Sequence, residues 1–94
     1  KTMALTEANI EDKIEVVGDY KAVQVRTARV IYDNGTEINR SFSRHVLQCS
    51  TKSDDTWSNT DISGESTEVQ GICNAVWTDA VRTAYQTAMD AQEL

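Results

Sequence analysis

The Asn34-Gly35 pair constrains this chain more than any other feature of its sequence. It lies between two runs in which apolar and polar residues alternate. A two-residue type I′ turn needs positive φ angles, which Asn and Gly adopt easily. The sequence therefore predicts one long β-hairpin from Tyr20 to Leu47. Such a turn also sets the register: Asp33 should face Thr36, and the residue numbers of every opposing pair should sum to 69.

This register divides the hairpin into two faces, and the face with the larger apolar content is expected to meet the core. That face comprises Val23, Val25, Thr27, Arg29, Ile31, Ile38, Arg40, Phe42, Arg44 and Val46. Three arginines are an unusual load for a buried face. Either their stems reach the sheet margin, or a bulge near Arg26-Thr27 shifts the phase, or carboxylates cover them.

The fold class predicted from these patterns is α+β, in a single domain that spans residues 1–94. A three-stranded antiparallel β-meander is expected to carry one or two C-terminal helices on one of its faces. The strands are expected at about residues 12–18, 21–32 and 37–48. The first of them is short, with Ile14 and Val16 on one face.

The second half of the chain changes from loop to helix. Residues 50–65 are rich in Ser, Thr, Asp, Asn and Gly, so we expect a loop there. Apolar residues then recur at helical spacing, which predicts helices at about residues 67–77 and 79–91. Ser66 or Thr67 is expected to cap the first helix and Thr78 the second, although one bent helix fits the same pattern.

Charge is distributed unevenly along the chain. The net charge of −6 disfavours a general nucleic-acid-binding role. Residues 20–48 nevertheless contain five basic and two acidic residues, whereas residues 49–94 contain two basic and eight acidic residues. Either the two halves complement each other within one fold, or the basic sheet binds an anion. No apolar run approaches the roughly 20 residues of a membrane span, and no secretory signal is recognisable, so no membrane partner is expected.

No motif in the sequence supports catalysis. His45 is the only histidine, and neither a G-x-S-x-G nor an H-E-x-x-H sequence surrounds it. We expect it to be solvated or hydrogen-bonded. Cys49 and Cys73 lack the spacing of a metal site, and we expect a reduced, partly buried pair, with a disulfide under oxidation as the alternative. We therefore predict no enzyme, no metal site and no cofactor.

The basic residues of the hairpin and one tryptophan are the candidate functional residues. Arginine is suited to bidentate contacts with carboxylates and phosphates. The candidate binding residues are Arg26, Arg29, Arg40, Arg44 and His45. The alternative is pairing of the arginines within the chain, with Glu15, Asp19, Glu65 or Glu68. Trp57 is an interface anchor if it is exposed in its polar loop, or else it folds back over the sheet.

Several stretches of the chain resemble small uncharacterised proteins encoded by marine bacteriophages and cyanophages. They are DKIEVVG at residues 12–18, VQVRTA at 23–28, NGTEINRSFSRHV at 34–46 and EVQGICNAVW at 68–77, with the region of Ala84-Tyr85. The resemblance covers most of the chain except residues 50–64. It implies a phage context and no transferable activity. Small acidic α+β domains in that context serve as virion parts or assembly accessories.

Two functional hypotheses follow. The first is a non-enzymatic, phage-type structural or accessory protein, found in the virion or the host cytoplasm. It would act through protein–protein contacts, as a capsid decoration, tail-associated or assembly module, and as a homo-oligomer. The second is a small binding module for an anionic ligand or nucleic acid at the hairpin arginines. Binding of the second kind should weaken steeply with salt, whereas apolar assembly should be nearly salt-indifferent.

Overall fold

The computed structural model describes residues 4–92, which form five strands and two helices. Three long strands make one antiparallel sheet in the order β1-β2-β3, and two short strands, β4 and β5, make a separate hairpin. The strands are β1 (Leu5–Val17), β2 (Ala22–Asp33), β3 (Thr36–Leu47), β4 (Ser50–Ser53) and β5 (Thr56–Asn59). The helices are α1 (Thr67–Val76) and α2 (Asp79–Gln92). The predicted α+β fold, a three-stranded antiparallel sheet followed by C-terminal helices, is confirmed.

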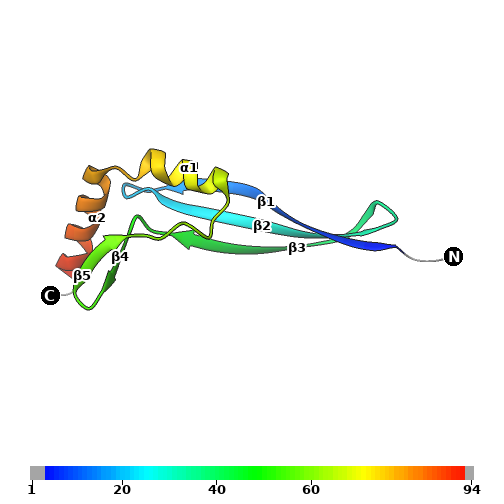
Figure 1. Ribbon diagram of the computed structural model, residues 1–94, viewed down its shortest axis with the longest axis horizontal. Coiled ribbons are helices and arrows are strands. Elements are labelled where there is room, and N and C mark those ends of the chain that lie inside the picture. Colours follow the sequence, from blue (N-terminus) through cyan, green and yellow to red (C-terminus); the bar gives the residue numbers. More distant parts are fainter. Residues whose placement is uncertain (1–3, 93–94) are drawn as a thin grey trace.

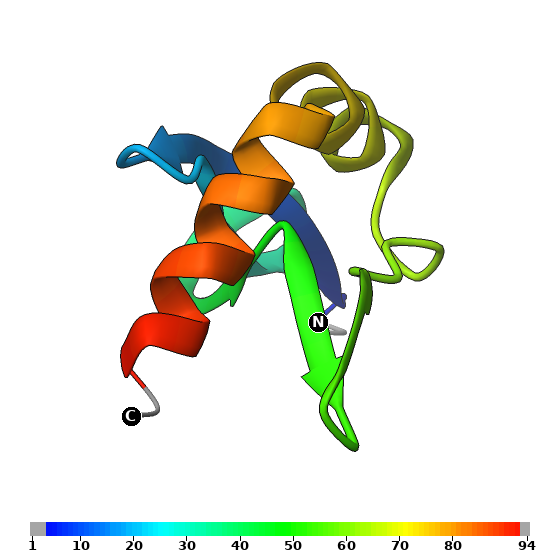
Figure 2. The same cartoon turned by 90° about the vertical axis from the view of Figure 1, so that its left-hand side faces the viewer.

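The molecule is long and narrow, with extents of 64 × 25 × 21 Å. Figure 1 shows both helices and the β4–β5 hairpin gathered at one end, while the other half consists of the three strands alone. Viewed from the helical end, α2 and the β4–β5 hairpin lie in front of the sheet (Figure 2). The Cα radius of gyration is 18.0 Å, whereas a compact chain of this length would have about 12 Å. The chain is therefore far from spherical.

The hydrophobic core lies at the helical end. Side chains of β2 meet the apolar stripe of α1, with Cys49 between the sheet and the helices. The buried cluster comprises Val23, Val25, Cys49, Val69, Cys73 and Trp77. Partly buried side chains from β1, β3 and α2 surround it, including those of Ile14, Leu47 and Tyr85. The helix stripe predicted from the sequence is thus the surface that α1 presents to the sheet.

Local capping explains where the helices begin. The Ser66 hydroxyl accepts a hydrogen bond from the Val69 amide at 3.2 Å, and Thr78 accepts one from the Val81 amide at 3.2 Å. Each bond satisfies an amide that the first helical turn leaves without a partner. The predicted caps are confirmed, and two helices rather than one bent helix form.

The β2–β3 hairpin turns at Asn34-Gly35 as predicted, with φ angles of 51° and 85°. The first two pairs, Asp33–Thr36 and Tyr32–Glu37, follow the predicted register. A bulge then leaves Ile38 without a partner, and Ile31 pairs with Asn39 instead. Because one extra residue inverts the facing of everything beyond it, the predicted assignment of β3 side chains to the core face is wrong.

Two other boundaries differ from the sequence prediction. β1 begins at Leu5, seven residues before the predicted strand at 12–18. Its early residues are mostly exposed on both faces, and a strand without a buried face carries no alternating pattern. Residues 50–65, expected to be a loop, contain the β4–β5 hairpin. Its two-residue turn is Asp54-Asp55, with φ angles of 51° and 62°.

Candidate interaction surface

The sheet extends well beyond the helix that covers it. The α1 N-cap Ser66 donates a hydrogen bond to Glu11 at 2.6 Å, which places the start of α1 at the row Glu11–Thr27–Ser43. Residues 5–11, 27–33 and 36–43 lie from that row to the hairpin tip, and we call them the arm. No helix of the described chain lies over the arm (Figure 1).

Apolar side chains are exposed along the sheet, mostly on the side away from α1, which we call the open face. By the register, Ile10, Phe42 and Val46 point to this face. Phe42 is 45% exposed and Val46 53%. Ala28 and Val30, between the larger side chains of the outer strands, are fully buried on the same face. The apolar surface of the open face in the arm thus comes from Ala8, Ile10 and Phe42, which flank the buried Ala28 and Val30.

Both outer strands of the three-stranded sheet are edges. β2 pairs with β1 on one side and with β3 on the other, and within residues 4–92 neither β1 nor β3 has a second strand neighbour. Edges of 13 and 12 residues are long, and unpaired edges are templates for the addition of a strand from another chain.

The five predicted binding residues do not form one site. Arg26, Arg40 and Arg44 lie on the open face, whereas Arg29 and His45 point to the side of α1. The predicted cluster of Arg29, Arg40 and Arg44 is therefore wrong, because the bulge at Ile38 moves the two β3 arginines to the other face. One alternative was a bulge near Arg26-Thr27 that shifts the facing of the hairpin side chains. Such a bulge does occur in the hairpin, but at Ile38. Opposite Arg26-Thr27 the irregularity lies in β1, at Asp12.

Three of the arginines form bidentate ion pairs with acids of the same sheet. Arg26 binds Asp12 at 2.8 and 2.9 Å. Arg29 binds Glu7 at 2.6 and 3.0 Å, and Arg40 binds Glu37 at 2.8 and 3.0 Å. Pairing within the chain is thus observed, but with acids of β1 and β3 rather than with the four acids named from the sequence.

These hydrogen bonds shift the ionisation of both partners. The guanidinium of Arg29 holds the pKa of the Glu7 carboxyl below its ordinary value, and Arg26 and Arg40 do the same to the pKa values of Asp12 and Glu37. The pKa of each arginine is raised in turn by the hydrogen bond to its acid. Each of these arginines is therefore neutralised by its acid and is less available to bind a ligand.

His45 also has a partner, since its Nε2 lies 2.9 Å from the Glu65 carboxylate just before α1. Arg44 differs from the other four candidates, because it has no carboxylate partner within residues 4–92. It lies directly opposite Arg26, which in turn lies opposite Lys13. A row of three cations thus crosses the open face, and sequence reasoning missed Lys13 as its third member.

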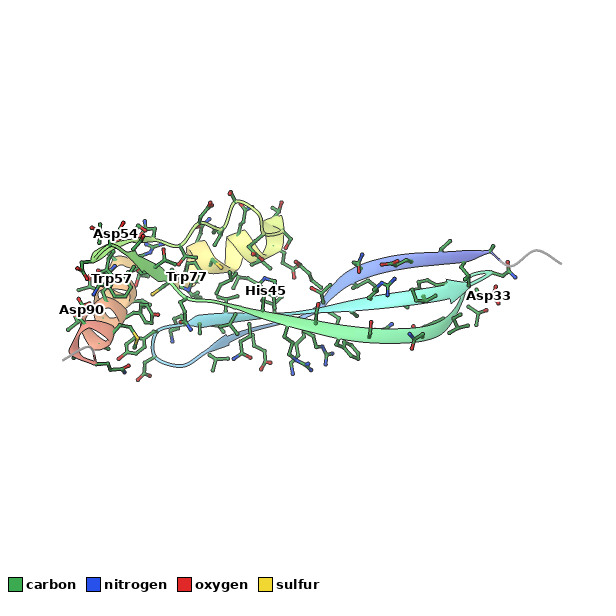
Figure 3. The ribbon with its side chains drawn as sticks, turned by 90° about the horizontal axis from the view of Figure 1, so that it is seen from below. Asp33, His45, Asp54, Trp57, Trp77 and Asp90 are labelled. Carbon is green, nitrogen blue, oxygen red and sulfur yellow. The ribbon has the colours of Figure 1, made fainter. Side chains whose placement is uncertain are left out.

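Trp57 packs back onto α2. Its indole nitrogen donates to both carboxylate oxygens of Asp90, at 3.1 and 3.2 Å. Lys52 binds the same carboxylate at 2.9 Å, and the Tyr85 ring meets the indole edge to face at 5.8 Å. Figure 3 shows Trp57 beside Asp90 at the helical end, opposite the tip marked by Asp33. The tryptophan therefore joins the β4–β5 hairpin to α2 and is partly buried there.

Cys49 and Cys73 are both free and buried, and burial raises the pKa of each thiol. No group of three or more His, Cys, Asp or Glu side chains between residues 4 and 92 is placed to hold a metal ion. Neither α1 nor α2 is long and apolar enough to cross a membrane.

Comparison of the chain with protein-family models, with characterised proteins and with solved structures finds no significant match.

Proposed function

We propose that this chain is a non-enzymatic structural or assembly protein of bacteriophage type, which associates with other copies of itself through the arm. The observation that carries the proposal is the arm: about a quarter of a 94-residue chain extends beyond the core with apolar side chains exposed and, within residues 4–92, both strand edges unpaired. A monomer of this mass typically exposes about 5,400 Å², whereas this chain exposes 6351 Å².

The surface composition supports a protein partner over a small ligand. Phe42 and Ile38, both from β3, are 45% and 55% exposed, and large apolar side chains at such positions anchor protein interfaces. The predicted alternative, an anionic ligand or nucleic acid held by five hairpin residues, has less support. Those residues lie on two faces, and three of the four arginines already hold carboxylates.

Light scattering at low and high salt tests self-association. We expect a discrete oligomer that persists at high salt, because burial of apolar surface is not screened by ions. Phe42→Ser should shift the population towards monomer. Val16→Ser is the matched control, since Val16 is similarly exposed at 42% but lies at the helical end and on the α1 side of the sheet. A monomer at every concentration, or equal losses in both variants, would refute self-association through the arm.

The phage context rests on the sequence resemblance and has its own test. Purified particles of a phage that encodes this chain should contain its tryptic peptides at a stoichiometry set by the capsid or tail symmetry. Detection only in the infected-cell lysate would point to an assembly accessory that leaves before the particle matures. Absence from both fractions, with the gene transcribed, would overturn the proposal of a phage structural or assembly role.

A further inference from the structure

We infer that the open face carries an oxyanion site at Lys13, Arg26 and Arg44, which takes one phosphate or carboxylate group of a ligand. This inference is independent of assembly through the arm. In the register of the sheet, Lys13, Arg26 and Arg44 are directly opposite one another on β1, β2 and β3. Like charges that face each other across strands destabilise a sheet.

Two bulges create this row. Without the bulge at Ile38, Arg44 would point to the α1 side of the sheet. The bulge at Asp12 lets Lys13 rather than Asp12 occupy the position opposite Arg26. Sheet irregularities of this kind often redirect side chains near functional sites. Both departures from a regular ladder thus bring positive charges together on one side of the sheet.

The charge of the row is only partly neutralised. Asp12 holds Arg26 at 2.8 Å, and Glu15 lies 3.3 Å from Lys13. Both residues of the Lys13–Glu15 pair are about half exposed, with fractions of 54% and 48%, so solvent weakens that pair. Arg44 has no acid within the described chain. One unbalanced guanidinium therefore remains, with its five N–H donors.

A hollow lies beside the row. It has a volume of about 160 Å³ and is lined by all three cations together with Glu15, Gln24 and Val46. The Gln24 side chain belongs to the next row of the open face, where its amide offers a further donor. Glu15 is the one acid of the lining, and its pair with Lys13 must open or tilt when an anion enters. These groups fit a single oxyanion held mainly by the Arg44 fork.

Phe42 packs against the Arg26 guanidinium on the side nearer the hairpin tip. The guanidinium carbon of Arg26 lies 4.5 Å from the centre of the Phe42 ring. Together with the bidentate contact to Asp12, this stacking fixes the direction of Arg26. Arg26 is thereby a positioning and electrostatic element, whereas Arg44 and Lys13 are the groups with capacity for a new partner.

NMR titration of the full chain with inorganic phosphate, and separately with acetate, tests the site. We expect saturable shifts at the Arg44 Nε–Hε resonance and at the amides of rows 13–26–44 and 15–24–46. A response to phosphate alone identifies a phosphate site, and a response to acetate alone identifies a carboxylate site. Chloride at the same ionic strength should produce no saturable shift. An equal response to chloride would overturn the inference in favour of general screening.

Arg44→Gln and Arg29→Gln are the matched variants. Both remove a hairpin arginine, but Arg29 lies on the other face and is paired with Glu7. Arg44→Gln should weaken the binding of the responding anion by about tenfold or more, the size expected for a lost charge-assisted hydrogen bond. Arg29→Gln should leave it within about twofold. Equal effects of the two substitutions, or wild-type binding by Arg44→Gln, would refute the site.

Thermal unfolding separates a ligand group from a structural one. Because Arg44 faces another cation, Arg44→Gln should melt no lower than wild type in buffer without the anion. The responding anion should raise the melting temperature of wild type and not that of Arg44→Gln. Lys13→Gln provides a second variant with the same expected direction. A clear loss of stability in Arg44→Gln without the anion would instead show that Arg44 has a structural role, and would overturn the assignment.

Discussion

The two halves of the three-stranded sheet are stabilised in different ways. At the helical end, β2 presents Val23 and Val25 to α1, and burial of apolar side chains holds the layers together. In the arm the same strands have no covering helix, and bidentate ion pairs such as Arg29–Glu7 tie them laterally. Burial is worth more than exposed ion pairs. We therefore expect the helical end to set global stability, whereas the arm is left uncovered by the helices of the described chain.

The largest effect is expected from Trp77 at the centre of the helical end. Its ring is 2% exposed, and its indole nitrogen donates to the Lys21 carbonyl at 2.8 Å. Trp77→Ala should therefore lower the free energy of unfolding by about 3–5 kcal/mol. Trp57→Ala is the control, with an expected loss of roughly 1–2 kcal/mol from its exposed contacts. Chemical denaturation measures both, and a larger loss in Trp57→Ala would contradict the location of the core.

The hairpin turn at the far end of the arm should give a smaller effect. Gly35 has a φ of 85° and nothing within 4 Å of an added Cβ, so Gly35→Ala tests backbone strain alone. It should cost about 1–2 kcal/mol, the penalty of a left-handed conformation for an L-residue. Gly64→Ala, which also meets nothing within 4 Å and whose φ is not positive, should change stability by less than about 0.5 kcal/mol.

Hydrogen exchange tests whether the two halves of β2 open separately. In Gly35→Ala, amides in the tip half of β2 should lose protection, whereas amides near Val23 and Val25 should keep theirs, because the two halves open separately. Uniform loss along β2 would show that the sheet unfolds as one unit. The distinction between a stable end and a locally opening arm would then fail.

The fold was predictable where local chemistry determines it. Asn34-Gly35 located the long hairpin, and Ser66 and Thr78 located the starts of the helices. The β4–β5 hairpin was missed because Asp54-Asp55 is a weak turn signal and the flanking strands have only four residues each. The first seven residues of β1 were missed because the arm leaves them without a buried face.

The candidate site was less predictable than the fold, for one main reason. The rule that the numbers of opposing residues sum to 69 fails after two pairs, at Ile38. No residue type in that segment is a recognisable signal for a β-bulge. From that point every β3 side chain is on the opposite face from the prediction. Arg44 and Arg26 therefore meet on the open face, and His45 meets Glu65 near α1. The charged residues were identifiable from the sequence, but which of them share a face of the sheet depended on the bulge at Ile38.

The smallest effect is expected from acid, and it should fall first on the arm. Arginine hydrogen bonds lower the folded-state pKa values of Glu7, Asp12 and Glu37. A lowered folded-state pKa adds stability that is present above the unfolded-state pKa and is lost as the pH falls through the folded-state pKa. Stability from these pairs should thus decline from about pH 4.5 downward, the ordinary value for glutamate.

Amide protection and tryptophan fluorescence together show whether the loss of stability in acid begins in the arm or in the core. In a Trp57→Phe background, where Trp77 is the one tryptophan left, amide protection in the arm should fall with acid before the fluorescence of the buried Trp77 changes. Asp90 at the helical end also has a lowered pKa, because Lys52 binds it, so α2 should loosen in the same range while the core remains. Arg29→Gln should be less stable than wild type at neutral pH and should show a shallower decline in acid. If its acid dependence equals that of wild type, the Arg29–Glu7 pair contributes nothing, and apolar and backbone contacts alone hold that part of the arm.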